Sequence, residues 1–187
     1  MKTKIFVISL LLSACNFLQA QSEKEMQAWM DYMTPGDVHK MLAKADGEWL
    51  SEATMWMDPA APPTKSTATV VNKMILGGRY QYSTFSGNMM GMPFEGISIL
   101  GYDNAKKIYL NTWIDNMGTG IMMMEGTWDE ASKTINLKGK MVDPTTGKDE
   151  DVREVFKLVD DKTQTMEMYG TKDGKEIKFM EAKLTKK

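Results

Sequence analysis

Arginine is the scarcest charged residue in this sequence, and its two copies are the first candidates for chemistry. Arg79 and Arg153 both fall within strand-like runs, whereas lysine is abundant throughout the chain. A guanidinium holds a carboxylate through two parallel hydrogen bonds, which an ammonium cannot do. The positions therefore predict bidentate partners, and we expect both arginines to point into the fold as its cationic anchor.

Two kinds of partner are compatible with these arginines. One is the anionic head group of a bound ligand. The other is a protein carboxylate on a neighbouring strand, with Arg79 paired to Glu95 or Asp115 and Arg153 to Glu167. Cross-strand pairs of opposite charge are common in sheets, so both interpretations remain open.

Three carboxylates offer a different chemistry because each interrupts an apolar strand run. They are Glu95 in P-F-E-G, Asp115 in W-I-D-N and Glu125 in M-M-E-G. A carboxyl group beside apolar walls can have a raised pKa and act as a general acid or base. The sequence supplies no second catalytic partner, so no residue is assigned a catalytic role.

Metal and thiol chemistry have little support. His39 is the only histidine, Cys15 is the only cysteine, and no Gly-x-Ser-x-Gly elbow is present. Zinc sites need several such ligands. Haem-binding barrels of the nitrobindin type use a histidine late in the chain, where this sequence has none. We expect neither a metal nor a cofactor, and we expect His39 to lie on the surface or on a lid.

The first twenty residues read as an export signal. Lys2 and Lys4 precede the apolar run 5–12, which is too short to span a bilayer. Cleavage after Ala20 would release a soluble protein, whereas lipobox cleavage would leave a lipidated Cys15. The predicted location is the periplasm, the exterior or the outer membrane as a lipoprotein.

Charge narrows the range of partners. The net charge is −2, with a sequence pI of about 5.5 and acidic and basic residues interspersed. This pattern argues against nucleic acid as a partner. Membrane contact is expected only through a lipid on Cys15, and the remaining partner is a small apolar or amphipathic ligand.

These residues must be positioned by a helical segment followed by strands. Helical spacing joins Met26, Trp29, Met30 and Met33, and then Val38, Met41, Leu42 and Ala45. The stripes predict two short helices that either cover one end of a sheet or form a lid. The predicted organisation is a signal peptide over 1–20, a helical segment over 21–46 and a sheet domain over 47–187.

From Gly47 onward the apolar period becomes two, and turn residues interrupt it at short intervals. Candidate strands are 47–57, 64–76, 79–87, 93–103, 107–115, 119–129, 133–142, 149–160, 163–171 and 175–185. About ten short strands without a helical crossover predict an all-β fold, a single antiparallel up-and-down barrel. Closure is favoured because it removes exposed edges.

The stretch from Met74 to Gly118 carries a family resemblance. It reads M-I-L-G-G-R-Y-Q-Y, then P-F-E-G-I-S-I-L-G-Y-D-N, then W-I-D-N-M-G. At these blocks the chain resembles the exported bacterial family called domain of unknown function 1579, over roughly Gly47 to the C-terminus. The resemblance implies a lipocalin-like barrel and no particular activity.

A second resemblance concerns the start of the barrel. Gly47-Glu48-Trp49 is similar to the Gly-x-Trp that opens lipocalins and fatty-acid-binding proteins, where the indole seals the closed end. We expect Trp49 and Trp113 to be substantially buried. The same comparison implies that Tyr82 or Tyr169 could assist the arginines, as in fatty-acid-binding proteins.

Methionine is unusually frequent, with 19 copies that include Met122, Met123 and Met124. Flexible thioethers suit a cavity that adapts to varied apolar ligands, although methionine also fills ordinary cores. The function we favour is an exported barrel that binds an apolar or amphipathic small molecule, anionic ones included. The alternatives are an envelope interaction protein without a cavity and an enzyme that uses a barrel carboxylate.

Overall fold

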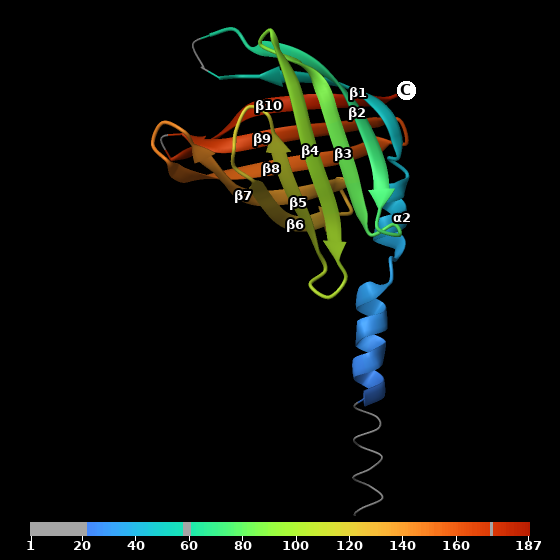
Figure 1. The fold of residues 1–187 in the computed structure, drawn as a ribbon. Coiled ribbons are helices and arrows are strands. Elements are labelled where there is room, and N and C mark those ends of the chain that lie inside the picture. Colours follow the sequence, from blue (N-terminus) through green and yellow to red (C-terminus); the bar gives the residue numbers. More distant parts are fainter. Residues whose placement is uncertain (1–21, 58–60, 173) are drawn as a thin grey trace, which may run out of the picture. The chain divides into compact units, whose positions relative to one another are not determined.

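The computed structural model describes residues 22–57, 61–172 and 174–187 (Figure 1). The chain forms two units, residues 1–34 and residues 35–187. The predicted signal and Cys15 lie outside the described residues. Among the described helices, none is both long and apolar enough to cross a membrane.

The described part of the first unit is the helix of residues 22–33, and its apolar stripe is exposed. Met26 and Trp29 retain 64% and 62% of their surface. Trp29 contacts Tyr32 edge to face, and Gln27 donates a 2.7 Å hydrogen bond to Asp31. These i, i+3 and i, i+4 contacts support the helix locally.

The second unit is a closed barrel of ten antiparallel strands, as the period-two pattern predicts. Each strand pairs with the next along the chain, and β1 closes the barrel against β10. The strands are β1 (Gly47–Met55), β2 (Thr64–Ile75), β3 (Tyr80–Met89), β4 (Met92–Asp103), β5 (Ile108–Asp115), β6 (Met122–Asp129), β7 (Thr134–Asp143), β8 (Lys148–Asp160), β9 (Thr163–Lys172) and β10 (Lys175–Lys186).

Local turn chemistry explains why neighbouring strands form hairpins. In the β4–β5 turn, the Asp103 carboxylate accepts hydrogen bonds from the backbone N–H groups of Ala105 and Lys106, at 2.8 and 2.9 Å. Lys107 then adopts a positive φ of 60°. An Asp side chain that binds the backbone ahead of it stabilises such a turn without long-range contacts.

The short helix α2 (Asp37–Ala43) lies across one end of the barrel (Figure 1). The Trp49 indole and the Asn72 amide both donate to the carbonyl of Ala45, at 2.8 and 3.2 Å. The Gln81 amide donates to the carbonyl of Leu42 at 2.9 Å. Carbonyls at a helix C-terminus lack intrahelical partners. Side chains from three strands supply these partners, and the α2 end of the barrel is therefore closed.

The prediction of a surface or lid position for His39 is wrong. His39 is 5% exposed, and its ring meets Tyr102 edge to face at 6.2 Å. Its Nδ1 accepts the backbone N–H of Gly36 at 3.0 Å. His39 precedes Leu42 by three residues and so shares the face of α2 that covers the barrel. Burial, with the nearby positive charge of Arg79, holds the His39 pKa below its ordinary value.

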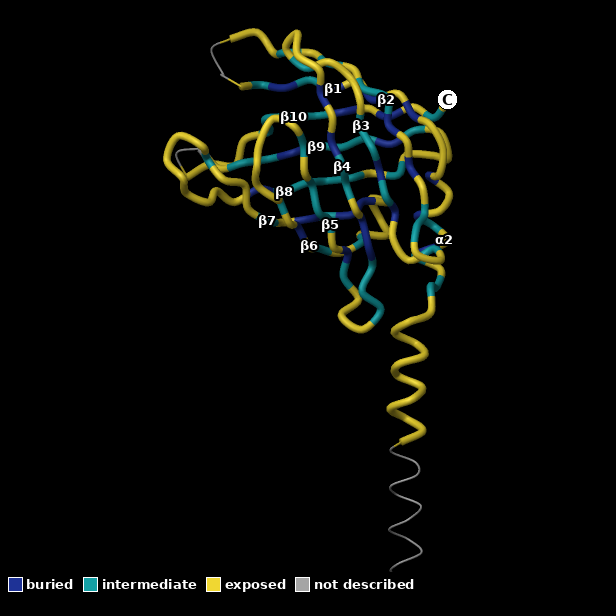
Figure 2. The backbone as a smooth tube through the Cα atoms, viewed as in Figure 1, coloured by how far each residue is buried: buried dark blue, intermediate teal, exposed yellow. Residues whose placement is uncertain are grey.

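The buried side chains form two separate clusters inside the barrel. Figure 2 shows that buried residues are spread over many of the strands. One joins Leu42 of α2 to Tyr109, Ile135, Leu137 and Val152 on the strands. The other surrounds Trp49, which is 1% exposed as predicted, and includes Val70, Ala182 and Leu184. The interior is therefore not one continuous apolar core.

Candidate functional site

Strand pairing determines which residues face the barrel interior. Trp49 pairs with Val70, which pairs with Phe85, which pairs with Gly96. Trp49, Val70 and Gly96 are buried. Successive residues point to opposite faces of a sheet, so each strand contributes every second residue to the interior.

Glu154 is the inward residue that least resembles its surroundings. On β8 it follows the buried Val152 by two residues and precedes Phe156 by two. Its cross-strand partners are Leu137 on β7 and Met168 on β9, both buried. Burial disfavours the charged form of a carboxyl group. It raises the pKa of Glu154 from 4.5 to about 7.

Glu154 also has no partner among the described residues. No hydrogen bond or charge contributes to its pKa, which burial alone shifts. In the described chain, every side-chain nitrogen or oxygen sealed from water-sized space has a hydrogen-bond partner. The Glu154 oxygens therefore border interior space that a water molecule can occupy, in agreement with the partial exposure of this residue.

A row of methionines extends from Glu154 around the barrel wall. Glu154 pairs with Met168, Met168 with Met180 and Met180 with Met55. Met168 and Met55 are each 8% exposed, and Met180 is partly buried. The carboxyl group thus lies beside an adaptable, polarizable apolar wall.

The methionines of β6 divide between the two faces of the sheet. Met122 and Met124 point inward, opposite Trp113 and Asn111 on β5. Met124 is 3% exposed, whereas Met123 points outward and is 67% exposed. Two of the three consecutive methionines therefore line the interior.

Aromatic side chains gather at the barrel end remote from α2. Trp113 contacts Phe85 edge to face at 4.9 Å and stacks on Phe94 at 6.3 Å. Its indole donates a 2.6 Å hydrogen bond to Asp115. Trp113 is partly buried, less deeply than Trp49. Its place near the rim leaves part of the ring open.

Gly96 makes room for the Trp113 ring, and Gly96→Ala should therefore destabilise the protein. A Cβ atom at Gly96 would lie 2.6 Å from the indole, which would have to move. We expect a loss of about 1–3 kcal/mol in the free energy of unfolding, typical of overpacking. Urea denaturation measures this loss. Gly118→Ala is the control because no atom lies within 4 Å of its Cβ position. Equal midpoints for the two variants would contradict the prediction.

Two of the predicted carboxylates lie near this rim, one on each face of the sheet. Glu95 and Asp115 line the same hollow of about 460 Å³, together with Phe85, Gly96, Thr84, Ser86, Ile97, Ile114 and Asn116. Asp115 occupies an inward position opposite Gly96. Glu95 is exposed on the outer face, as Glu125 is on β6. Neither Glu95 nor Glu125 lines the interior.

The prediction that Arg153 points into the barrel is wrong. Arg153 lies between the inward residues Val152 and Glu154, so its side chain projects from the outer face. Nε and an Nη of Arg153 donate to the two carboxylate oxygens of Glu176 at 2.8 and 2.7 Å. The guanidinium also lies 4.0 Å from the Tyr169 ring centre. The partner is thus a protein carboxylate, and it is Glu176, not Glu167.

Tyr169 and Glu167 belong to the same outer network. The Tyr169 hydroxyl donates to Glu167 at 2.8 Å, and Lys178 donates to Glu167 and Glu181. Hydrogen bonds from Tyr169 and Lys178 hold the Glu167 pKa below its ordinary value. Tyr169 therefore belongs to a network of surface charges and does not face the barrel interior.

Arg79 and Tyr82 also differ from the prediction. Arg79 is exposed in the β2–β3 turn, where an Nη donates to the Leu76 carbonyl at 3.1 Å. Glu95, one of the predicted partners of Arg79, pairs with Ser86 on β3. Ser86 is six residues beyond the start of β3, so Glu95 lies about 20 Å from the turn that holds Arg79. Tyr82 points outward, between the buried inward residues Gln81 and Ser83.

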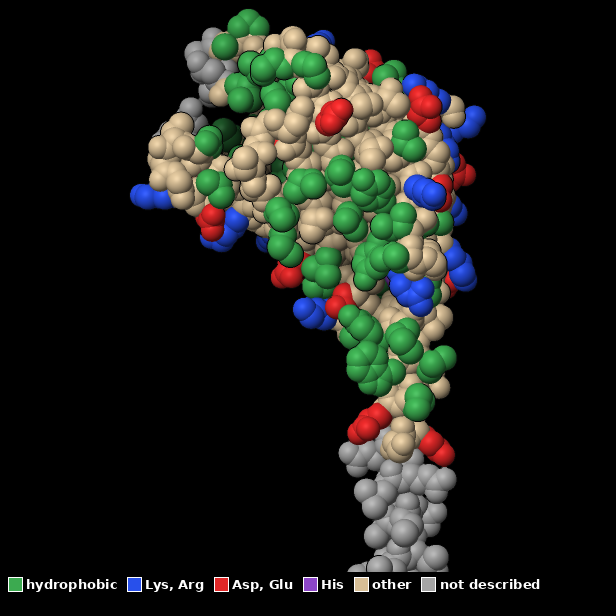
Figure 3. Space-filling view, viewed as in Figure 1, with side chains coloured by type: hydrophobic (Ala, Val, Ile, Leu, Met, Phe, Trp, Pro, Cys, Tyr) green, Lys and Arg blue, Asp and Glu red, His purple; other side chains and the backbone are tan. Residues whose placement is uncertain are grey.

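Figure 3 shows hydrophobic side chains gathered on the outer face over β3 and β4.

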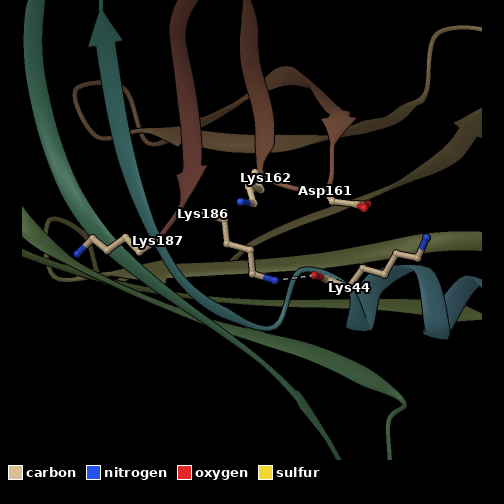
Figure 4. Close-up of a pocket in the computed structure, with 5 residues that line it drawn as sticks. All are labelled: Lys44, Asp161, Lys162, Lys186 and Lys187. Atoms are coloured by element: carbon tan, nitrogen blue, oxygen red, sulfur yellow. Dashed lines mark hydrogen bonds between the residues drawn. The ribbon is translucent and has the colours of Figure 1, made fainter.

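A second hollow lies at the closed end. It measures about 520 Å³ and is lined by Lys44, Asp161, Lys162, Lys186 and Lys187. Figure 4 shows the Lys44 and Lys187 side chains pointing apart. Lys186 donates to the Lys44 carbonyl at 2.9 Å, and Lys187 pairs with Glu48. The four ammonium groups do not converge on one point, so this hollow is a poor anion site.

The described residues contain no cluster of three metal-binding side chains.

The interior carboxyl group of Glu154 is the feature that sequence reasoning missed. A signal was present because Val152, Phe156 and Leu158 share the strand face that Glu154 interrupts. Val155 and Val159 make the opposite face partly apolar as well, which obscured the pattern.

Comparison with known proteins agrees with the fold. A family model described as "Protein of unknown function (DUF1579)" matches residues 34–186. The crystal structure of Rv2717c from M. tuberculosis is similar, with a TM-score of 0.61 and 14% identity. The match covers 82% of this chain and 99% of that one. At this identity the likeness concerns the fold alone. A comparison with curated proteins found no match.

Proposed function

The chain belongs to the DUF1579 family, whose description names no activity, and we propose from its geometry that it binds a small molecule inside the barrel. The observation that carries this proposal is Glu154, a carboxyl group that has no partner within the described part of the chain and borders water-sized interior space. An unpaired buried acid is costly to keep in a purely structural core. A bound molecule would provide the missing partner.

The lining of the interior supports an apolar or amphipathic ligand. Methionines 55, 168 and 180 form a flexible wall beside Glu154. Three neighbouring inward positions carry small side chains, since Ala53 pairs with Ala182 on one side and with Ser66 on the other. Binding sites of this kind are mostly apolar, with a few placed polar groups.

The proposal includes export through the signal predicted over residues 1–20. It departs from the predicted arginine anchor because Arg79 is exposed in a turn and Arg153 is paired with Glu176 outside the barrel. The polar end of the ligand is therefore assigned to Glu154.

Catalysis is the second candidate, and one observation favours it. A carboxyl group with a pKa of about 7 is suited to proton transfer near neutral pH. Its nearest inward partners across the ladder, Leu137 and Met168, offer neither a nucleophile nor a second acid. Catalysis would require a second catalytic group that these neighbours do not provide, whereas binding requires only Glu154 and the apolar wall, so binding is the function we favour.

Filling the interior should abolish binding of a neutral apolar dye. Ser66 faces inward opposite Ala53, whereas its neighbour Thr67 is exposed on the outer face. We expect Ser66→Phe to weaken Nile red binding by about tenfold or more because the ring occupies ligand space. Thr67→Phe adds the same group outside and should bind as the wild type does.

Fluorescence titration measures the affinities, and circular dichroism shows that both variants are folded. Native mass spectrometry of protein purified from its own host would show a retained ligand as added mass. If folded Ser66→Phe and Thr67→Phe bind the dye equally well, the dye site is not the barrel interior.

A further inference from the structure

Carboxylates occupy inward positions at the barrel rim and on β8. Asp115 lies at the rim remote from α2, opposite Gly96, and Glu154 occupies the inward face of β8. The hollow that Asp115 lines includes neither lysine nor arginine among its described lining residues. A molecule that enters from this rim therefore passes the Asp115 carboxylate before it reaches the unpaired carboxyl group of Glu154.

Among the residues that the structure describes, no neutralising group lies near Glu154. Its own strand places Val152 and Phe156 on either side of it, β7 presents Leu137, and β9 presents Met168. None of these residues titrates. Tyr109 shares the cluster of Leu137 and Val152, but burial raises its pKa to about 12, so it remains neutral. The ionised form of Glu154 thus lacks any compensating charge.

We propose that the barrel binds an apolar amine whose ammonium group pairs with the Glu154 carboxylate. This inference rests on the proposed function and names its ligand class. An ammonium supplies both the missing charge and several hydrogen-bond donors. The apolar body of the amine would lie against the methionine row and the ring of Phe156, and aromatic faces attract cations.

Other head groups fit the site less well. A carboxylate ligand would bring a second negative charge to a place without cations, and like charges repel strongly at low dielectric. An alcohol can donate one hydrogen bond to Glu154 but leaves its charge uncompensated. The site should therefore rank the three head groups as amine, alcohol and carboxylate.

Three probes with the same chain test this ranking: octylamine, octanol and octanoate. Calorimetric titration at about pH 8, where Glu154 is mostly ionised, should give octylamine an affinity about tenfold or more above that of octanol. Glu154→Gln should remove this advantage and leave octanol binding almost unchanged. Glu125→Gln removes an exposed outer carboxylate and should preserve the advantage.

Acidification provides a second measurement. At about pH 6 Glu154 is mostly protonated, and octylamine should bind about tenfold more weakly than at pH 8, while octanol should not change. Equal affinities for the three probes, or an amine preference that survives in Glu154→Gln, would overturn the amine assignment while leaving interior binding intact. Failure of all three probes to bind would instead count against the proposed function itself.

Discussion

Trp49→Ala should lower the free energy of unfolding by about 3–5 kcal/mol, the range for deletion of a buried tryptophan. Trp49 is 1% exposed and packs in a cluster with Val70, Ala182 and Leu184. Its indole also donates to the Ala45 carbonyl just beyond the C-terminus of α2. The substitution would thus open a cavity and remove a hydrogen bond that fixes α2 on the barrel end.

Trp29→Ala is the matched control because it removes the same side chain from an exposed position, 62% accessible. It should shift stability by about 0.5 kcal/mol or less. Urea denaturation followed by circular dichroism measures both variants. A midpoint for Trp49→Ala close to that of the wild type would mean that the indole does not close the barrel.

Glu154 should make the protein less stable as the pH rises from about 5 to about 8. Its pKa is about 7 when folded and 4.5 ordinarily, so the folded state binds the proton more tightly. Stability from this group is therefore complete below pH 4.5 and is lost as the pH rises through 7. The difference between the two pKa values corresponds to about 3 kcal/mol.

Glu154→Gln isolates this contribution because glutamine has a similar shape but cannot ionise. The gap in unfolding free energy between variant and wild type should widen in favour of the variant as the pH rises from about 5 to about 8. The lowered pKa of His39 makes stability rise with pH, the opposite of the Glu154 effect. Because both proteins contain His39, its contribution cancels in the difference between them. Glu125→Gln, on the outer face, should show no such trend. Parallel stability curves for wild type and Glu154→Gln would show that the carboxyl group is not desolvated.

Local patterns were sufficient to predict the architecture. Apolar residues at every odd position from Ile135 to Met141 predicted β7, and Asp103-Asn104 predicted the turn before β5. Side-chain period and turn chemistry act over a few residues, so they can be read without the partner strands. Both predicted helices are present, and the stripe of α2 covers the barrel end. The stripe of the helix of residues 22–33 is exposed, so the expectation that it would cover an apolar surface is wrong.

Only the tertiary structure shows which charged side chains point into the barrel and which point outward. On β8 apolar residues occupy both faces, with Val152 and Phe156 inside and Val155 outside. Sequence therefore could not tell whether Arg153 or Glu154 pointed inward. Strand pairing with Leu137 and Met168 decided that Glu154 does. Contact between Arg153 and Glu176 depends likewise on the strand order, in which β9 separates β8 from β10 and the two side chains meet across β9.

The sequence by itself determined the barrel, its strand boundaries to within a few residues and the residue types available for chemistry. It also determined that only one histidine and two arginines exist to serve a site. Tertiary structure alone decided that the arginines would be outside and a glutamate inside. The reason is that desolvation is not a property of a residue or its neighbours in sequence: ten strands must close before apolar side chains surround Glu154 and its pKa rises to about 7.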